Sequence, residues 1–199
     1  MAKESVPVDS ILEAAQRLFL AKGCQNTSLE DIAKEVKIDI KKLKAAFPSV
    51  EDIVRKILDR DIAESTELFT RTINDRGKAD VKLARLVREL MVRYQQSYVV
   101  SCVVCEGIEH ADSDIRFVKS CLTPEQIDRY RHNTAILGRL IAQGQSEALF
   151  TDADPVEAAY LLRGMMGAAV RYRLVTGKDD DIRDHADFVM RIFLKGLLR

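Results

Sequence analysis

The chain has 199 residues, of which 47% are hydrophobic and 31% are charged, as is usual for a globular protein with one or two domains and a buried core. Its 31 lysines and arginines balance its 31 aspartates and glutamates, which excludes the basic excess of a protein that coats nucleic acid without sequence preference. Any contact with DNA must therefore come from a local basic patch.

Two capping boxes open the predicted elements. Residues Ser10 to Glu13 form the first, in which the Ser side chain accepts from a free backbone N–H and the Glu side chain reaches back. Apolar residues at helical spacing follow it, and Gly23 suits a left-handed helix end. Residues Thr27 to Glu30 form the second box and open a short helix.

Two more helices follow at once. Asp39 caps a third helix of residues 40–46, and Pro48 ends it because proline disfavours helical geometry in the residue before it. Ser49 then starts a fourth helix, and the polar residues 74–78 break the pattern after it.

The second half of the chain is also helical. Residues 99–105 are largely β-branched and apolar, but a single strand would have no partner, so we interpret them as buried helix. Thr123 and Asp154 each precede a proline, which favours a helix start. The sequence therefore predicts an all-α fold of about nine helices. The later ones begin near Asp80, Val99, Thr123, Asp154 and Asp180.

The elements before Phe47 have the proportions of a helix-turn-helix. A long helix supports two short ones, which a tight turn at Lys37 and Ile38 joins, and in this arrangement the last short helix enters the major groove of DNA. Between Ala33 and Phe47 there are five lysines and two acids. Such a cluster suits phosphate contacts, although lysines on a short helix are also common as a plain solvated face.

Several segments together resemble the N-terminal signature of the TetR family of regulators. They are Ile11–Phe19, Lys22-Gly23, Thr27-Ser28, Asp31–Ala33, Leu43 and Phe47–Ser49. The resemblance covers about a quarter of the chain, with the family's spacing throughout. It implies a three-helix DNA-binding domain at residues 1–49 and a helical domain at residues 50–199 that binds a small molecule and dimerises.

Departures from the family pattern fall where DNA is touched. Lys37 stands where the family usually has Gly, Asp39 replaces a Ser or Thr cap, and Lys44 stands in place of an aromatic residue that contacts phosphate. Ala46 and Val50 also differ from the usual residues. The candidate DNA-binding residues are Thr27, Ser28, Lys37, Lys41, Lys42 and Lys44.

The resemblance also implies a ligand cavity among the middle helices. The residues expected to line it are Tyr94, Tyr98, Cys102, Tyr130, Tyr160, Arg163 and Met166. Such a lining is apolar with a few polar groups and would suit an apolar or weakly anionic aromatic ligand. The alternative is that the tyrosines are ordinary core residues whose hydroxyls are satisfied.

A homodimer is expected because one short recognition helix buries too little surface for tight specific binding. The resemblance places the interface on the last two helices, where Gly164, Gly167, Ala168 and Ala169 permit close helix approach. The expected interface residues are Leu161, Gly164, Met165, Ala168, Ile182, Val189, Ile192 and Phe193. The alternative is that these residues only pack against their own chain.

Cys102, Cys105 and His110 offer a second kind of site, because thiols and imidazole on one helix face bind transition metals or react as a redox pair. Buried packing and cavity lining are the competing interpretations, since cysteine is often buried for packing alone. No metal, cofactor or catalytic motif is expected, and the chain is interpreted as a non-enzyme.

The compartment follows from what the sequence lacks. No apolar run approaches the roughly 20 residues of a membrane span, and residues 1–9 do not resemble a signal peptide. The four cysteines do not form a secreted disulfide framework, so we expect a cytoplasmic protein. The predicted function is a repressor that a small molecule releases from its DNA operator. The alternatives are a metal or thiol sensor on the same scaffold and a relative that has lost DNA binding.

Overall fold

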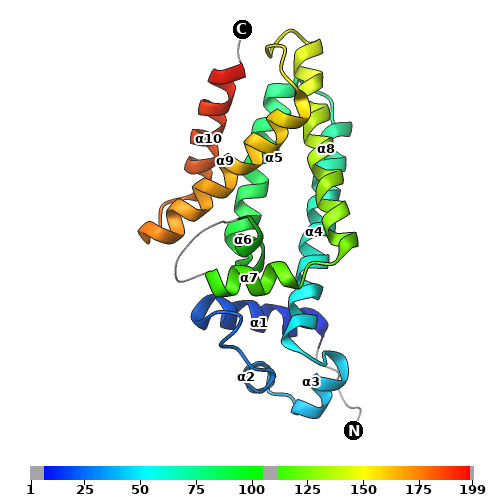
Figure 1. Ribbon diagram of the computed structural model, residues 1–199, viewed down its shortest axis with the longest axis vertical. Coiled ribbons are helices and arrows are strands. Elements are labelled where there is room, and N and C mark those ends of the chain that lie inside the picture. Colours follow the sequence, from blue (N-terminus) through cyan, green and yellow to red (C-terminus); the bar gives the residue numbers. More distant parts are fainter. Residues whose placement is uncertain (1–6, 105–111, 198–199) are drawn as a thin grey trace.

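The computed structural model describes residues 7–104 and 112–197, which form ten α-helices and no strand (Figure 1). The all-α prediction is confirmed, with one helix more than expected. The helices are α1 (Val8–Lys22), α2 (Leu29–Glu35), α3 (Ile40–Ala46), α4 (Val50–Asn74), α5 (Ala79–Gln96), α6 (Tyr98–Val104), α7 (Asp112–Ser120), α8 (Pro124–Ser146), α9 (Pro155–Thr176) and α10 (Ile182–Leu197).

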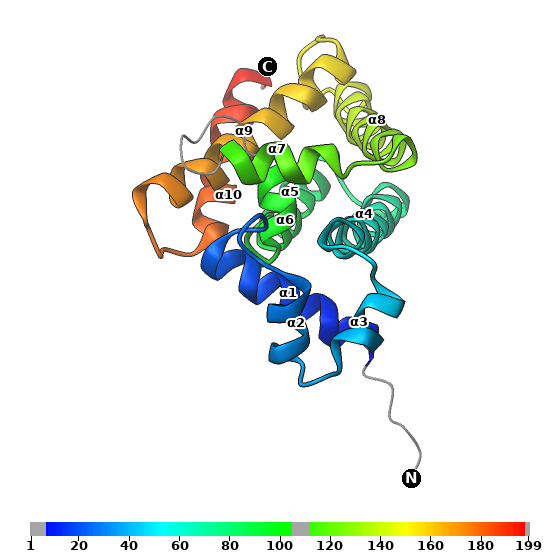
Figure 2. The same cartoon turned by 60° about the horizontal axis from the view of Figure 1, so that its bottom comes forward.

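The helices form a small unit and a larger bundle. In Figure 1, α1, α2 and α3 lie at one end, α4 rises from them into the bundle, and α9 and α10 cover one side of it. Figure 2 shows α1 beside α6, with α2 and α3 on the side away from the bundle. One hydrophobic core continues through both parts, and its largest buried side chains are Phe19, Phe69 and Phe150.

Two predicted helix starts were wrong. α1 begins at Val8 after Pro7, with no side-chain cap, so Ser10 lies inside the helix and not at its start. α2 begins one residue later than expected, because Ser28 is the cap and accepts from the backbone of Asp31. Thr27 cannot cap α2 because its side chain is buried and donates to the carbonyl of Gly23 at 2.8 Å.

The turn between α2 and α3 is a Schellman motif. The backbone N–H of Ile38 donates to the carbonyl of Ala33 at 2.9 Å, and that of Lys37 donates to Lys34 at 3.2 Å. Lys37 itself has φ of 56°, in the left-handed region that favours glycine. The family's usual Gly at this place therefore has a backbone reason, and Lys37 adopts the same conformation with a side chain present.

The middle of the chain differs most from the prediction. α5 ends at Gln96, and α6 begins at Tyr98, one residue before the expected start at Val99. Ser101 contributes to this break, since its hydroxyl donates to the carbonyl of Tyr94 at the end of α5. The helix α7 was not predicted, and it packs against α6.

The other start signals are confirmed. Ser49 caps α4, Thr123 forms a capping box with Gln126 at α8, and Asp154 caps α9 before Pro155. Gly177 ends α9 in the left-handed conformation. Over the residues described, none of these helices is both long enough and apolar enough to span a membrane.

Candidate functional site

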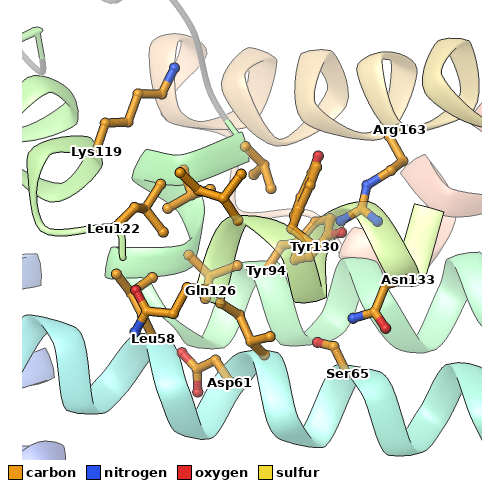
Figure 3. Close-up of a pocket in the computed structure, with 15 residues that line it drawn as sticks. Leu58, Asp61, Ser65, Tyr94, Lys119, Leu122, Gln126, Tyr130, Asn133 and Arg163 are labelled. Carbon is orange, nitrogen blue, oxygen red and sulfur yellow. The ribbon is translucent and has the colours of Figure 1, made fainter. Parts of the chain in front are cut away.

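A cavity of about 330 Å³ lies inside the bundle (Figure 3). This volume is in the range of small-molecule sites. Part of its wall is aliphatic, and another part carries tyrosine, amide and charged side chains. The lining residues are Leu58, Asp61, Ile62, Ser65, Tyr94, Val100, Val103, Val104, Lys119, Leu122, Gln126, Ile127, Tyr130, Asn133 and Arg163.

Arg163 reaches from α9 into the polar part of the cavity (Figure 3). The central carbon of its guanidinium lies 3.7 Å from the centre of the Tyr130 ring and 5.9 Å from that of Phe69. Its Nη1 donates to Oγ1 of Thr134 at 3.0 Å. The negative ring faces attract the cation and fix its place at the cavity wall.

Two acidic groups of the lining have pKa values above their usual range. Burial raises the pKa of the Tyr94 hydroxyl, although the nearby Arg163 opposes the shift, so Tyr94 is a neutral donor and acceptor at pH 7. Burial also raises the pKa of Asp61. The Oδ2 of Asp61 accepts from the hydroxyl of Ser97 at 2.6 Å, and Nε of Arg60 lies 3.6 Å from its Oδ1.

The structure brings three of the expected ligand residues to the cavity: Tyr94, Tyr130 and Arg163. Cys102 and Met166 are buried but do not line it. Tyr160 is 50% exposed on α9, so it does not form an inner wall, and the side chain of Tyr98 lies outside the described part.

Sequence reasoning missed five polar lining residues, which are Asp61 and Ser65 on α4, Lys119 on α7, and Gln126 and Asn133 on α8. Asn133 lies one helical turn after Tyr130, so the inner stripe of α8 held a signal for it.

The described cysteines, Cys24, Cys102 and Cys121, are all buried. Burial raises the pKa of Cys24, followed by the nearby carboxylate of Asp114, and burial also raises the pKa of Cys121. Cys24 and Cys121 therefore remain thiols at neutral pH, which lowers their reactivity. Cys105 and His110 lie outside the described residues, so the metal or thiol alternative stays a prediction.

A buried carboxylate joins α7 to the turn between α1 and α2. Asp114 accepts from the backbone N–H of Cys24 at 2.9 Å and from that of Gln25 at 3.0 Å. The side chain of Gln25 also donates to the carbonyl of Ser113 at 2.8 Å. Because α7 also carries the cavity residue Lys119, this contact connects one wall of the cavity to the three-helix unit.

The helix α3 presents lysines to solvent. Leu43 is fully buried and anchors α3, while Lys41 and Lys42 are exposed. Asp39 caps the helix and accepts from the backbone N–H of Lys41 at 2.7 Å. In the part of the chain that the structure describes, no carboxylate lies within ion-pair distance of Lys37, Lys41 or Lys42, so their charges are open to an anion.

Lys44 differs from the other lysines because it is paired. Its Nζ lies 2.9 Å from Oε1 of Glu30, and this hydrogen bond is the main cause that lowers the pKa of the Glu30 carboxyl. Exposed ion pairs contribute little to stability. Lys44 can therefore exchange Glu30 for a phosphate at small cost.

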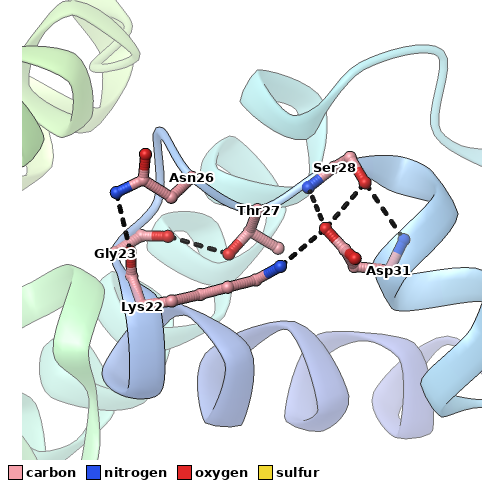
Figure 4. Close-up of polar contacts among 6 residues, drawn as sticks. All are labelled: Lys22, Gly23, Asn26, Thr27, Ser28 and Asp31. Carbon is pink, nitrogen blue, oxygen red and sulfur yellow. Dashed lines mark hydrogen bonds and ion pairs between the residues drawn. The ribbon is translucent and has the colours of Figure 1, made fainter.

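Thr27 and Ser28 form hydrogen bonds within the protein (Figure 4). Thr27 is only 4% exposed, which corrects its expected role as a phosphate ligand. The hydroxyl and backbone N–H of Ser28 both donate to Asp31, as does Lys22 at 2.7 Å. The Lys22 hydrogen bond is the largest cause that holds the pKa of Asp31 well below its usual range. Ser28 is exposed, but its hydrogen-bonding groups are already partnered.

The outer face of α9 and α10 is apolar and exposed. Leu161 is 61% exposed, Ile192 is exposed, and Gly164 and Ala168 lie open on the same helix as Leu161. Met165 is half-buried. Exposed apolar residues that were not predicted for this face are Val156, Tyr160, Tyr172, Val175 and Phe188.

Other residues expected at this face point into their own chain. Ile182, Val189 and Phe193 are buried in the core, which corrects their assignment to a partner surface. A Cβ on Gly167 would collide with the carbonyl oxygen of Val104, so the small size of Gly167 serves the approach of α6 to α9 within the chain.

Comparisons of sequence agree with the three-helix unit. Residues 11–57 match the family described as bacterial regulatory proteins of the tetR family. The YuxN protein of Bacillus subtilis (strain 168), an HTH-type transcriptional regulator, is 34% identical over 85 residues, which are 43% of this chain and 28% of that protein. The chain thus matches less than a third of this relative's length.

Comparisons of structure extend over nearly the whole chain. The fatty acid degradation regulator FadR from Bacillus halodurans has a TM-score of 0.77 at 18% identity, with 100% of both chains covered. A transcriptional regulator from Saccharomonospora viridis, in complex with choline, has a TM-score of 0.68 at 22% identity and covers 96% of this chain and 97% of its own. Similarity at this identity shows the fold. The sequence match to the tetR family is confined to residues 11–57, and the structural similarity extends over the rest of the chain.

Proposed function

We propose that this protein is a homodimeric repressor that a small molecule releases from its DNA operator. The observation that carries the proposal is a contact between the three-helix unit, which bears the exposed lysines of α3, and the bundle that encloses the cavity. Asp114 of α7 makes this contact through two hydrogen bonds to the backbone of the turn between α1 and α2. Residues 1–49 are proposed as the DNA-binding domain and residues 50–199 as the domain that senses and dimerises.

The DNA half of the proposal rests on α3. Two copies of α3 in a symmetric dimer would enter successive major grooves and read a near-palindromic operator. Lys37, Lys41, Lys42 and Lys44 would neutralise phosphates and release counterions, which makes the affinity depend on salt. The dimer would form through the exposed face of α9 and α10, because contiguous apolar surface marks an interaction site.

The sensing half rests on the walls of the cavity. A ligand can release DNA only if it binds more tightly to a conformation whose two α3 helices no longer match the half-sites. A ligand against α6 and α7 would move the segment that holds the turn between α1 and α2. The choline complex of the S. viridis regulator supports small-molecule binding by this fold, without identifying the ligand of this chain.

The test is a gel shift with the DNA upstream of the protein's own gene, using a variant with Lys41, Lys42 and Lys44 changed to Ala. Each phosphate contact contributes about 0.9 to the slope of log affinity against log salt, so the triple variant should bind weakly with a slope smaller by two to three. The matched control changes three exposed arginines of α8, Arg129, Arg131 and Arg139, to Ala. Equal loss in both variants, or no loss in either, would refute the assignment of DNA binding to α3.

A further inference from the structure

Two residues that line the cavity each carry a buried polar atom with no hydrogen-bond partner among the described residues. The two atoms are Nε of Arg163 and Oδ1 of Asn133. Nearly all buried polar atoms in folded proteins are satisfied, because an unsatisfied one costs the full desolvation of that atom. A donor and an acceptor left open on two residues of one cavity are groups that a bound molecule can satisfy.

The two atoms belong to the same end of the cavity. Asn133 follows Tyr130 by one helical turn on α8, and the guanidinium of Arg163 stacks on the Tyr130 ring and donates to Thr134, the neighbour of Asn133. The orientation of the Asn133 amide is fixed, because its Nδ2 donates to Oγ1 of Thr66 at 3.0 Å. Its Oδ1 therefore remains an acceptor.

The charge of Arg163 also lacks a partner. In the described part of the chain its contacts are the neutral hydroxyls of Thr134 and Tyr94 and the rings of Tyr130 and Phe69, with no carboxylate at ion-pair distance. Charges removed from water are normally paired, and Nε of the half-buried Arg163 is removed from water. Arg163 is thus a cation that an anionic ligand in the cavity would pair with.

The acid of the cavity wall is in the opposite situation. Asp61 accepts from Ser97 and lies beside Arg60, which are not part of the cavity lining. Its charge is compensated from outside the cavity, so it offers little attraction to a cationic ligand. The uncompensated charge of the cavity is therefore positive.

We propose that the cavity binds a carboxylate with an apolar tail and with a hydroxyl near the carboxylate. A carboxylate oxygen accepts from Nε of Arg163 in a charge-assisted hydrogen bond. The hydroxyl donates to Oδ1 of Asn133. The tail lies against the aliphatic part of the wall, which Leu58, Val100 and Leu122 represent. This inference rests on the sensing half of the proposed function.

The experiment measures binding to the full-length protein by isothermal titration calorimetry, with octanoate, 3-hydroxyoctanoate, octanamide and octyltrimethylammonium as probes of matched length. Octanoate should bind at millimolar or lower concentration and more tightly than octanamide or the ammonium compound. The Arg163→Gln variant should lose about ten- to a hundredfold in affinity for both carboxylates, as expected for a charge-assisted hydrogen bond. Arg163→Lys, which keeps the charge, should retain part of the binding.

The hydroxyl should strengthen binding to the native protein, and Asn133→Ala should abolish this gain. The control is Arg139→Gln, which removes the same charge from the exposed face of α8 and should leave the affinities unchanged. The assignment of a carboxylate ligand would be overturned if the ammonium compound bound more tightly than octanoate, if octanoate did not bind, or if Arg163→Gln bound octanoate as tightly as the native protein. A hydroxyl without effect would overturn the role of Asn133.

Loss of fold does not obscure these outcomes, because Arg163→Lys and the melting temperature of each variant show whether the bundle is intact. A gel shift in the presence of octanoate separates the two proposals. If octanoate binds through Arg163 but leaves operator affinity unchanged, the ligand assignment stands and the sensing function fails. If the protein binds its operator but no carboxylate, DNA binding stands and the ligand assignment fails.

Discussion

Replacing Lys37 with glycine should stabilise the protein while weakening its contact with DNA. Lys37 occupies the left-handed region, with φ of 56°, at the end of α2. A residue with a side chain costs about 1–2 kcal/mol in that region, because its Cβ approaches the following carbonyl. Glycine avoids most of this cost, but it also makes the unfolded chain more flexible, which offsets about 0.4–1 kcal/mol.

The net effect of Lys37→Gly relative to Lys37→Ala is therefore a gain of about 0.5–1 kcal/mol. For a chain of this size it corresponds to a rise in melting temperature of about 1–4 °C. The alanine variant is the matched reference because it also removes the ammonium but keeps the left-handed cost. Both variants should bind DNA equally, with a salt slope lower by about 0.9 if Lys37 contacts a phosphate.

Thermal and urea unfolding followed by circular dichroism measure the stability difference. Ala148, with φ of 57° after the end of α8, provides an internal standard, since Ala148→Gly relieves the same kind of conformation far from α3. Its variant should gain similar stability and bind DNA like the parent. The reasoning is refuted if Ala148→Gly is stabilising while Lys37→Gly is no more stable than Lys37→Ala.

Two further predictions concern the connection between the parts and the dimer. Asp114→Ala should lower the free energy of unfolding in urea by about 2–4 kcal/mol, because it leaves the backbone N–H groups of Cys24 and Gln25 without their charged acceptor. Asp114→Asn should lower it less. A loss below about 1 kcal/mol for the alanine variant would show that water replaces the carboxylate. Leu161→Glu should shift the protein toward monomer in analytical ultracentrifugation, since it places a charge in the proposed apolar interface. The control Val81→Glu changes a similarly exposed residue on α5 and should not alter association. Equal association of the two variants would exclude the outer face of α9 and α10 as the interface.

Helix starts were predicted correctly where one residue had both the side chain and the position to cap. Ser49, Thr123 and Asp154 are such residues, and each accepts a backbone hydrogen bond in the structure. The start of α2 was ambiguous because two hydroxyl residues are adjacent there. Burial of Thr27 decides between them, and burial depends on the packing of α1 against α2, which local sequence does not contain.

The cavity was only partly predictable for a similar reason. Tyr130 and Arg163 were identified because polar or aromatic residues stand out within an apolar stripe. Tyr160 was placed wrongly because α9 carries apolar residues on both faces, with Leu162 and Met166 buried and Leu161 exposed. When a helix is apolar all round, its periodicity does not indicate which face is the inner one.

Gly23 shows how the family signature and the cavity wall depend on each other. Its φ of 87° already favours glycine, but space is a second and independent requirement. A Cβ at this position would lie 2.5 Å from Oδ2 of Asp114, the atom that accepts from the backbone of Cys24. A side chain here would therefore displace the carboxylate that joins α7 to the three-helix unit. Since Asp114 accepts from backbone N–H groups, its two hydrogen bonds do not depend on which side chains residues 24 and 25 carry, whereas they do depend on the glycine. The Lys22-Gly23 step of the signature thus preserves a surface on which α7 can dock, in addition to ending α1.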